Sequence, residues 1–556
     1  MINVDSAGTT AYERWRELAL GVLAKSGLPQ EALTTTTYDG IPVAPLYWEA
    51  GPRALTPPGR AGEWDVRQRH AEADPAAACE AVLADLENGA TSLWLVTSGS
   101  AGITPADLPR VLDGVLLDLA PVVLEGPGAE VLLGLLPGET PGGTLGLDPG
   151  DPLVLRAARE FRGLRSVVID ALPAHDAGGG EGEELGCSIA EGVAALRALT
   201  AAGLSTQEAY GQLEFRYAAD TDQFLTVAKL RAARRLWARV GELVGAEGPQ
   251  SQHAVTSSAM MTARDPWVNI LRTTIACFAA GVAGADAVTV QPFDAVLGAP
   301  SALARRIARN TQTIVMAEAH AARVADPAAG SWYVEELTAE LADRAWAWFQ
   351  EIERAGGHAT AAEKLIPERL AETRAARLAD LAHRRRPITG VSEFPNLEEV
   401  PPTPGGPGPG LASLGFRRAQ PYEELRDLAD AAVARTGVRP AVFLAALGSP
   451  ARHTARVGFA TGLFQAGGFA TPTAAGDPAE LAAAFAASGA RTACLCGDER
   501  DYAGTAEQVA VALRAAGATA VMLAGRADVP GVDRTIFTGC DALGVLQELH
   551  GNGATP

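Results

Sequence analysis

Few residues of this sequence have the types and spacing that chemistry at a defined site requires. Its eight histidines stand singly. The pair Cys494-x-Cys496 has no second pair of cysteines or histidines at zinc spacing. Gly178-Gly-Gly180 does not belong to a Gly-x-Gly-x-x-Gly helix start, so it is not a dinucleotide-binding loop. We interpret the cysteine pair as strand packing and expect no metal-binding residues.

Positive charge gathers at two places, which we interpret as salt-bridged or solvated surfaces. These are the helix with Arg231, Arg234, Arg235 and Arg239, and the run Arg384–Arg386 after His383. The whole chain has 46 basic and 66 acidic residues, a net charge of -20. Because nucleic-acid binding needs a basic face, that class is excluded. A phosphate-bearing small molecule in a locally basic pocket is not excluded.

The spacing of the cysteines and the length of the apolar segments indicate in which cellular compartment the protein is expected. The six cysteines are Cys79, Cys187, Cys277, Cys494, Cys496 and Cys540. Such thin spacing is typical of buried thiols in a reducing compartment, since disulfide scaffolds are short and dense in cysteine. The first residues lack the features of a signal peptide, and no apolar run approaches the ~18 residues that span a bilayer. We expect a cytoplasmic protein without a membrane segment.

The C-terminal part alternates predicted strands and helices. It follows Pro401–Gly410, a Pro/Gly run that predicts a linker. Strands are predicted at 441–447, 492–496, 519–523 and 535–538, and helices at 452–465, 477–489, 505–516 and from Asp541 onward. Repeated βα units with short turns predict a flavodoxin-like, doubly wound parallel sheet.

The N-terminal part has the same alternation over a greater length. Helices are predicted at 74–88, 191–202, 223–244 and 334–355, and strands at 92–96 and 166–170. Over ~300 residues this rhythm favours a (β/α)₈ TIM barrel. We therefore predict an α/β protein with a helical arm (1–36, its helix beginning at Tyr12), a barrel (37–392), a linker with a lead-in helix (393–437) and a sheet domain (438–556). The arm is expected to bury its apolar face on a partner or on the barrel.

Several ordered segments resemble the methylmalonyl-CoA mutase family. They are Tyr38–Tyr47, Trp64–Gln68, Val227–Trp237, Arg306–Gln312 and Ala325–Leu337. The resemblance runs from about residue 37 to residue 393. It implies a barrel threaded by the pantetheine arm of a CoA ester and a cobalamin-binding sheet domain. In catalytic members adenosylcobalamin supplies the radical, while protein groups position the substrate.

The sheet domain departs from the family's cobalamin motif, Asp-x-His-x-x-Gly, whose imidazole binds cobalt. Pro450, Arg452 and Ala455 occupy the three motif positions. A guanidinium has no lone pair to offer cobalt. His453 lies one place away without an aspartate two residues before it, so we interpret it as a surface helix histidine. Further on, Ala524-Gly525 stands for the family's Gly-Gly, and Cys496-Gly-Asp498 lies near its Ser-x-Leu loop.

The barrel departs from the family at its acyl-handling residues. Arg69 stands where catalytic members have a substrate-facing tyrosine, and Pro173 stands where they have the histidine that polarises the thioester. His175 lies two positions further on. It is a weak substitute for the missing histidine, because a shift of two positions changes the direction in which a side chain points. The segment Ala254–Ser258 has lost an amide, whereas Glu318 persists either as a site remnant or in packing.

The resemblance therefore implies the small, non-catalytic subunit of a heterodimeric methylmalonyl-CoA mutase, with no catalytic or cofactor-binding residues of its own. Such a chain would stabilise a large subunit that binds adenosylcobalamin and interconverts (R)-methylmalonyl-CoA and succinyl-CoA, with acyl-CoA bound in the complex. Two alternatives stay open. One is a self-sufficient acyl-CoA mutase using His175 and His453. The other is a free-standing acyl-CoA-binding protein.

Overall fold

The computed structural model describes residues 4–48, 56–98, 102–138, 140–405 and 415–551. The chain divides into two compact units. The first comprises Met1–Ala259, Ile270–Arg374 and Gly405–Gly415. The second comprises Met260–Asn269, Ala375–Pro404 and Phe416–Pro556. Part of the predicted linker, 406–414, lies outside the described residues.

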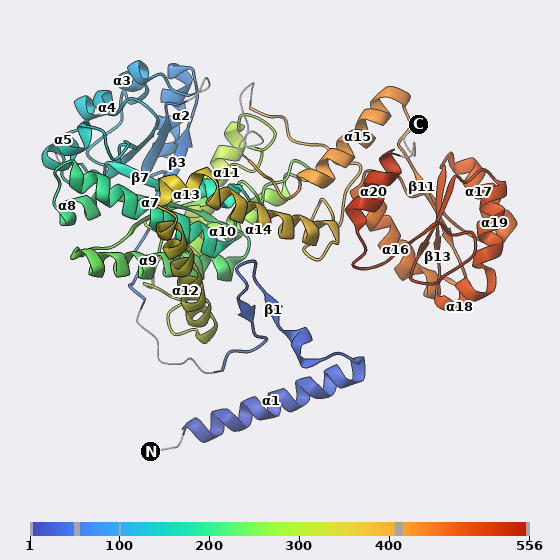
Figure 1. Cartoon of the computed structure of the whole chain (residues 1–556). Helices are drawn as coiled ribbons and strands as arrows, with labels where there is room; N and C mark the ends of the chain where they lie inside the picture. Colours follow the sequence, from blue (N-terminus) through green and yellow to red (C-terminus); the bar gives the residue numbers. More distant parts are fainter. Residues whose placement is uncertain (1–3, 49–55, 99–101, 139, 406–414, 552–556) are drawn as a thin grey trace. The chain divides into compact units, whose positions relative to one another are not determined.

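Eight parallel strands form a barrel in the first unit (Figure 1). They are β3 (Asp65–His70), β4 (Ser92–Val96), β5 (Val122–Glu125), β6 (Gly143–Thr144), β7 (Val167–Asp170), β8 (Leu213–Ala219), β9 (Ser251–Thr256) and β10 (Ala287–Thr289). Their order is β6-β5-β4-β3-β10-β9-β8-β7, and a bridge between Thr144 and Arg165 joins the two ends of the series. This cyclic order confirms the predicted TIM barrel.

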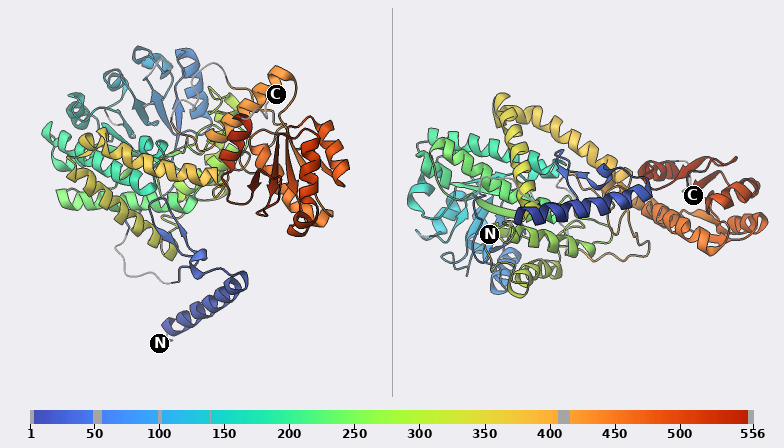
Figure 2. Two further views of the ribbon diagram at one scale, coloured as in Figure 1. Left: turned by 45° about the vertical axis from the view of Figure 1, so that its right-hand side comes forward. Right: turned by 90° about the horizontal axis from the view of Figure 1, so that it is seen from below.

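Helices surround these strands. They are α2 (Pro75–Glu87), α3 (Leu108–Val111), α4 (Ala129–Leu135), α5 (Leu153–Glu160), α6 (Leu172–Asp176), α7 (Glu181–Ala201), α8 (Thr206–Gly211), α9 (Gln223–Val244), α10 (Val268–Val282), α11 (Ala302–Thr313), α12 (Trp332–Arg354), α13 (His358–Glu363) and α14 (Leu365–Ala382). A short 3₁₀ turn at Pro105–Asp107 and a π-helix at Ile314–Glu318 complete the set, while a second 3₁₀ turn, Gln30–Leu33, belongs to the arm. Helices α7, α9 and α12 pack against one another, as Figure 2 shows from two further directions.

The arm begins with a longer helix than the sequence predicted. Helix α1 covers Val4–Ser26, so the predicted start at Tyr12 was wrong by two turns. A short hairpin of β1 (Thr35–Thr36) and β2 (Pro42–Val43) follows. Tyr12 stacks on Trp48 with ring centroids 4.9 Å apart, while Leu18 and Val22 are exposed.

The second unit contains a five-stranded parallel sheet of order β12-β11-β13-β14-β15. The strands are β11 (Val442–Ala446), β12 (Thr473–Ala475), β13 (Thr492–Cys496), β14 (Ala520–Ala524) and β15 (Arg534–Ile536). Helices α15 (Gln420–Thr436), α16 (Pro450–Ala466) and α20 (Ala542–Gly551) share one core with the sheet. Helices α17 (Pro478–Ser488) and α19 (Glu507–Ala515) share a second core with it. This arrangement confirms the flavodoxin-like fold, in which strand β12 had not been predicted.

Two smaller findings complete the fold. Of the six free cysteines, Cys79 and Cys540 are only half-buried, so the prediction of buried thiols was wrong for these two. No helix within the described ranges has the length and apolar character needed to cross a membrane.

Candidate functional site

The carboxyl ends of barrel strands are where enzymes of this fold place catalytic residues, and here polar side chains meet there. His175, on α6 just after β7, lies with its Nε2 2.6 Å from Ser257 Oγ, just after β9. Its Nδ1 lies 3.4 Å from Glu184 Oε2 on α7. Lys229 on α9 donates to the same Glu184 oxygen at 2.6 Å. All four residues are buried, and both ring nitrogens of His175 face protein groups.

Charge compensation decides the ionisation of this cluster. Burial alone would raise the pKa of Glu184, but Lys229 and His175 outweigh it and hold that pKa below its ordinary value. The carboxylate is therefore ionised. Sequence reasoning singled out His175 but missed its partners, although one signal was present. Lys229 lies four residues after Leu225 and seven before Leu236, on the buried face of α9.

A second charged group lies across three strands. Arg216 on β8 pairs with Asp170 on β7 at 3.0 Å and with Glu125 on β5 at 3.4 Å. Its guanidinium carbon lies 4.1 Å from the centre of the Trp94 ring. Arg69 points toward the same ring at 5.3 Å. The position of the family's substrate-facing tyrosine therefore holds a cation that packs beside an arginine and a tryptophan.

The segment that lost its amide is built into the barrel wall. Val255 is buried and packs with Trp94 in a small apolar cluster. The side-chain amide of Gln291, just after β10, lies beside this segment. It donates to Thr256 O and, at 3.0 Å, to Ser258 Oγ. This amide is therefore used to bind the neighbouring strand and the loop that follows it.

The segments that keep the family pattern bind one another. Trp64 Nε1 donates to Gln312 Oε1 at 3.0 Å. Arg231, on α9, forms ion pairs with Asp326 and Glu335, so the segments Val227–Trp237 and Ala325–Leu337 meet. These retained residues hold the barrel together.

Among the other arginines and the retained glutamate, some agree with the sequence-based interpretation and some do not. Arg239 pairs with Glu242 as predicted. Arg234 instead donates to Gln252 Oε1 and Pro57 O, so a salt bridge was the wrong prediction for it. Glu318 is exposed at the end of the π-helix, which rules out a role in core packing. After α14, Arg384 pairs with Glu393, while Arg385 is exposed.

The carboxyl edge of the five-stranded sheet holds an ion pair at the motif position. Arg452, in the first turn of α16, pairs with Asp501 at 2.8 Å, and Asp501 is nearly buried. Asp501 belongs to α18 (Glu499–Asp501), a turn that runs into a π-helix, Tyr502–Ala506. A Cβ on Gly448, at the end of β11, would lie within 2.7 Å of the Asp501 carboxylate. The carboxylate therefore lies directly against the strand end.

Tyr502 occupies the space beside this ion pair. Its hydroxyl donates to Ala524 O at 2.6 Å and accepts a hydrogen bond from Gly497 N at 2.9 Å. The ring is 3% exposed and would lie 3.1 Å from a Cβ on Gly525. One side chain thus binds both places, Cys496–Asp498 and Ala524–Gly525, that correspond to the family's Ser-x-Leu loop and Gly-Gly.

The remaining candidate ligands are held in local packing. Cys494 and Cys496 are buried on β13, which confirms strand packing. His453 is half-buried on α16, and its enclosed Nδ1 makes no hydrogen bond with any residue that the structure describes. In the part of the chain that the structure describes, no three His, Cys, Asp or Glu side chains form a group that could hold a metal ion.

Comparisons with known proteins decide the family. A family model described as methylmalonyl-CoA mutase matches residues 153–409. The chain is 52% identical to a methylmalonyl-CoA mutase small subunit from Streptomyces virginiae, over 96% of this chain and 95% of that protein. It is 42% identical to a probable small subunit from Mycobacterium tuberculosis strain H37Rv, over 92% of each chain. It is 37% identical to the small subunit from Propionibacterium freudenreichii subsp. shermanii, over 96% and 93%.

The chain belongs to the methylmalonyl-CoA mutase family. Within the family it resembles the small subunits. At the sheet edge, Arg452 stands at the position of the family's cobalt-binding histidine, offers a metal no lone pair and is tied to Asp501. Tyr502 fills the adjoining space.

Proposed function

We propose that this chain is the small, non-catalytic subunit of a heterodimeric methylmalonyl-CoA mutase. It binds no cofactor and stabilises the large subunit, which holds adenosylcobalamin and acyl-CoA and interconverts (R)-methylmalonyl-CoA and succinyl-CoA by a radical rearrangement. The free cysteines, four of them buried, agree with a cytoplasmic location. The names of the relatives, small subunits, support a partner chain.

The Arg452–Asp501 ion pair carries this proposal. A cobalt ligand must offer a lone pair, and a metal-binding imidazole is usually oriented by a carboxylate. Here Pro450 stands at the position of that carboxylate, and Arg452, at the ligand position, is paired with Asp501 at 2.8 Å. The barrel supports the same conclusion, since Pro173 carries no donor and both nitrogens of His175 face Ser257 and Glu184.

The test uses the full chain alone and the full chain mixed with the large subunit. We expect adenosylcobalamin to leave the absorption spectrum of the isolated chain unchanged and to bind the complex at one site per heterodimer. We expect mutase turnover only in the complex. Stoichiometric cobalamin on the isolated chain would contradict the proposal.

The same preparations separate the two alternatives. A self-sufficient mutase predicts turnover by this chain alone that is lost in His453→Ala. A free-standing acyl-CoA-binding protein predicts saturable binding of a CoA ester and no 1:1 complex with the large subunit in gel filtration. We expect neither result.

A further inference from the structure

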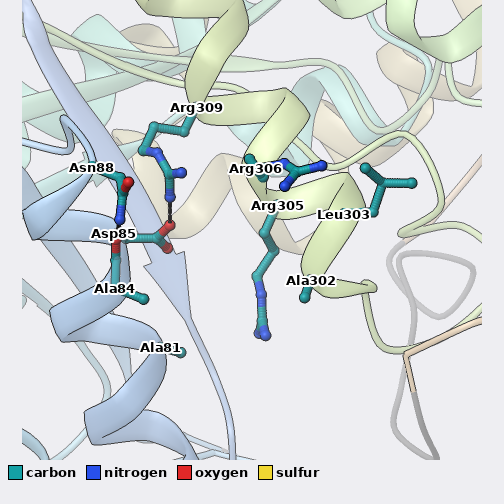
Figure 3. Close-up of a pocket in the computed structure, with 9 residues that line it drawn as sticks. All are labelled: Ala81, Ala84, Asp85, Asn88, Ala302, Leu303, Arg305, Arg306 and Arg309. Carbon is teal, nitrogen blue, oxygen red and sulfur yellow. Dashed lines mark hydrogen bonds and ion pairs between the residues drawn. The ribbon is translucent and has the colours of Figure 1, made fainter.

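A groove lies between two outer helices of the barrel, α2 and α11 (Figure 3). It has a volume of about 340 Å³, within the range of small-molecule sites. Helix α2 contributes Ala81, Ala84, Asp85 and Asn88, and α11 contributes Ala302, Leu303, Arg305, Arg306 and Arg309. The alanines leave the space open and give it an apolar wall.

Positive charge dominates the α11 side of the groove. Arg309 pairs with Asp85 across the groove, and Arg305 pairs with Glu72. Arg306 is exposed and makes no hydrogen bond or ion pair with any residue that the structure describes. The lining therefore carries three cations and one anion, although the chain as a whole has a net charge of -20.

The first turn of α11 adds to the positive electrostatic potential in the groove. The helix has 12 residues, Ser301 caps it by accepting from Ala304 N, and Ala302 and Leu303 of its first turn line the groove. The positive end of the helix dipole favours an anion there. Guanidinium groups bind phosphate through paired N–H donors, and an apolar wall suits the organic part of a ligand.

We propose that this groove binds a small phosphate monoester, with Arg306 and Arg305 on the phosphate and the alanine wall against the organic group. The site does not depend on the proposed function, because it lies between α2 and α11 rather than inside the barrel. An acidic peptide segment is the competing occupant. The size of the groove and its apolar wall favour the small molecule.

Isothermal titration calorimetry on the full chain at low ionic strength tests the proposal. The probes are inorganic phosphate, AMP, adenosine and hexaglutamate. We expect AMP to bind more tightly than phosphate, and adenosine and hexaglutamate not to bind. Arg306→Ala should weaken AMP binding at least about 10-fold, which corresponds to a loss of about 1.4 kcal/mol of binding free energy. Arg306→Lys should weaken it less, because it keeps the charge but loses the paired donors.

Two further variants keep the test decisive. Ala84→Leu fills the groove from an exposed position without changing charge and should abolish binding. Arg239→Ala removes an exposed arginine on α9 and should leave binding unchanged. Absence of AMP binding, AMP binding that survives both Arg306→Ala and Ala84→Leu, or binding of hexaglutamate alone would each overturn the proposal.

Discussion

At the scale of single residues, the buried pair of Lys229 and Glu184 links two barrel helices. Both side chains are at most 1% exposed, and their charged atoms lie 2.6 Å apart. We predict that Lys229→Met lowers the free energy of unfolding by about 3–5 kcal/mol, because Glu184 would be left buried without its counter-charge. Urea denaturation followed by circular dichroism measures this change.

The matched control is Arg239→Ala, which removes a pair with Glu242 in which both side chains are more than half exposed. Its effect should stay below about 0.5 kcal/mol. A loss in Lys229→Met as small as this would show that water or a rearrangement compensates Glu184.

A second prediction concerns the carboxyl of Glu191 on α7. Burial, with a smaller contribution from Asp170, raises the pKa of Glu191 to about 8. Between pH 4.5, the ordinary pKa of a glutamate, and about pH 8, the carboxyl of Glu191 therefore keeps a proton in the folded state that it has released in the unfolded state. The stability contribution of this group is full below pH 4.5 and is lost progressively as the pH rises to about 8.

Glu191→Gln removes this titration while keeping the shape of the side chain. Relative to the parent chain, we predict that the variant gains stability as the pH rises from 5 to 8, by up to about 3 kcal/mol. Denaturant titrations at four pH values measure the difference. A constant difference across that range would mean that the group titrates normally in the folded protein.

At the scale of elements, local signals predicted strands and capped helices well. The predicted strand 492–496 and helix 223–244 coincide with β13 and α9. Asp477 caps α17 by accepting from two backbone N–H groups, and Gly489 ends that helix in a left-handed conformation. These features depend on neighbours in the sequence, which is why the sequence contains enough information for them.

The elements that were missed depend on distant contacts. Helix α7 begins at Glu181, ten residues before its predicted start, and includes Gly182 and Gly186. A Cβ on Gly186 would lie 2.5 Å from the Trp348 ring of α12. The glycine thus serves close helix packing and does not end the helix. Strand β12 has three residues and none is buried, so no periodicity could reveal it.

The same limit applies to the candidate site. Alignment with the family motif placed Arg452 at the ligand position, but its partner Asp501 is 49 residues further along the chain. Only the fold shows that this carboxylate binds the guanidinium and that Tyr502 fills the neighbouring space. Sequence comparison therefore identified which groups were lost, and the structure identified what replaced them.

Two glycines with similar backbone angles provide a test of that sheet edge. Gly448 has φ +75 and faces the Asp501 carboxylate, whereas Gly489 has φ +70 and a Cβ added to it would meet no atom within 4 Å. Gly489→Ala should cost about 1 kcal/mol from backbone strain alone. Gly448→Ala should cost at least about 1 kcal/mol more, because Asp501 must move.

Chemical denaturation of both variants provides the comparison. Equal losses in the two variants would mean that Asp501 moves freely and that its ion pair with Arg452 contributes little to the stability of this edge.

At the scale of the whole molecule, the arm presents large apolar side chains to the solvent. On α1, Leu18 is 59% and Val22 is 64% exposed. Exposed apolar residues grouped on one helix are typical of an interaction surface. If the proposed heterodimer exists, we predict that the double substitution Leu18→Glu and Val22→Glu weakens association with the large subunit at least about 10-fold, or about 1.4 kcal/mol.

Analytical ultracentrifugation of the mixed subunits measures this association, and Glu17→Gln on the same helix is the matched control. Within the described part of the chain, Glu17 pairs with Arg14 at 3.5 Å, and both side chains are at least 70% exposed. The melting temperature of the isolated chain should be unchanged in all variants, since Leu18 and Val22 lie outside the core. Failure of the parent chain to bind the large subunit would contradict the proposed function. Equal binding by parent and double variant would contradict only the role of the arm, because the heterodimer would then form through another surface.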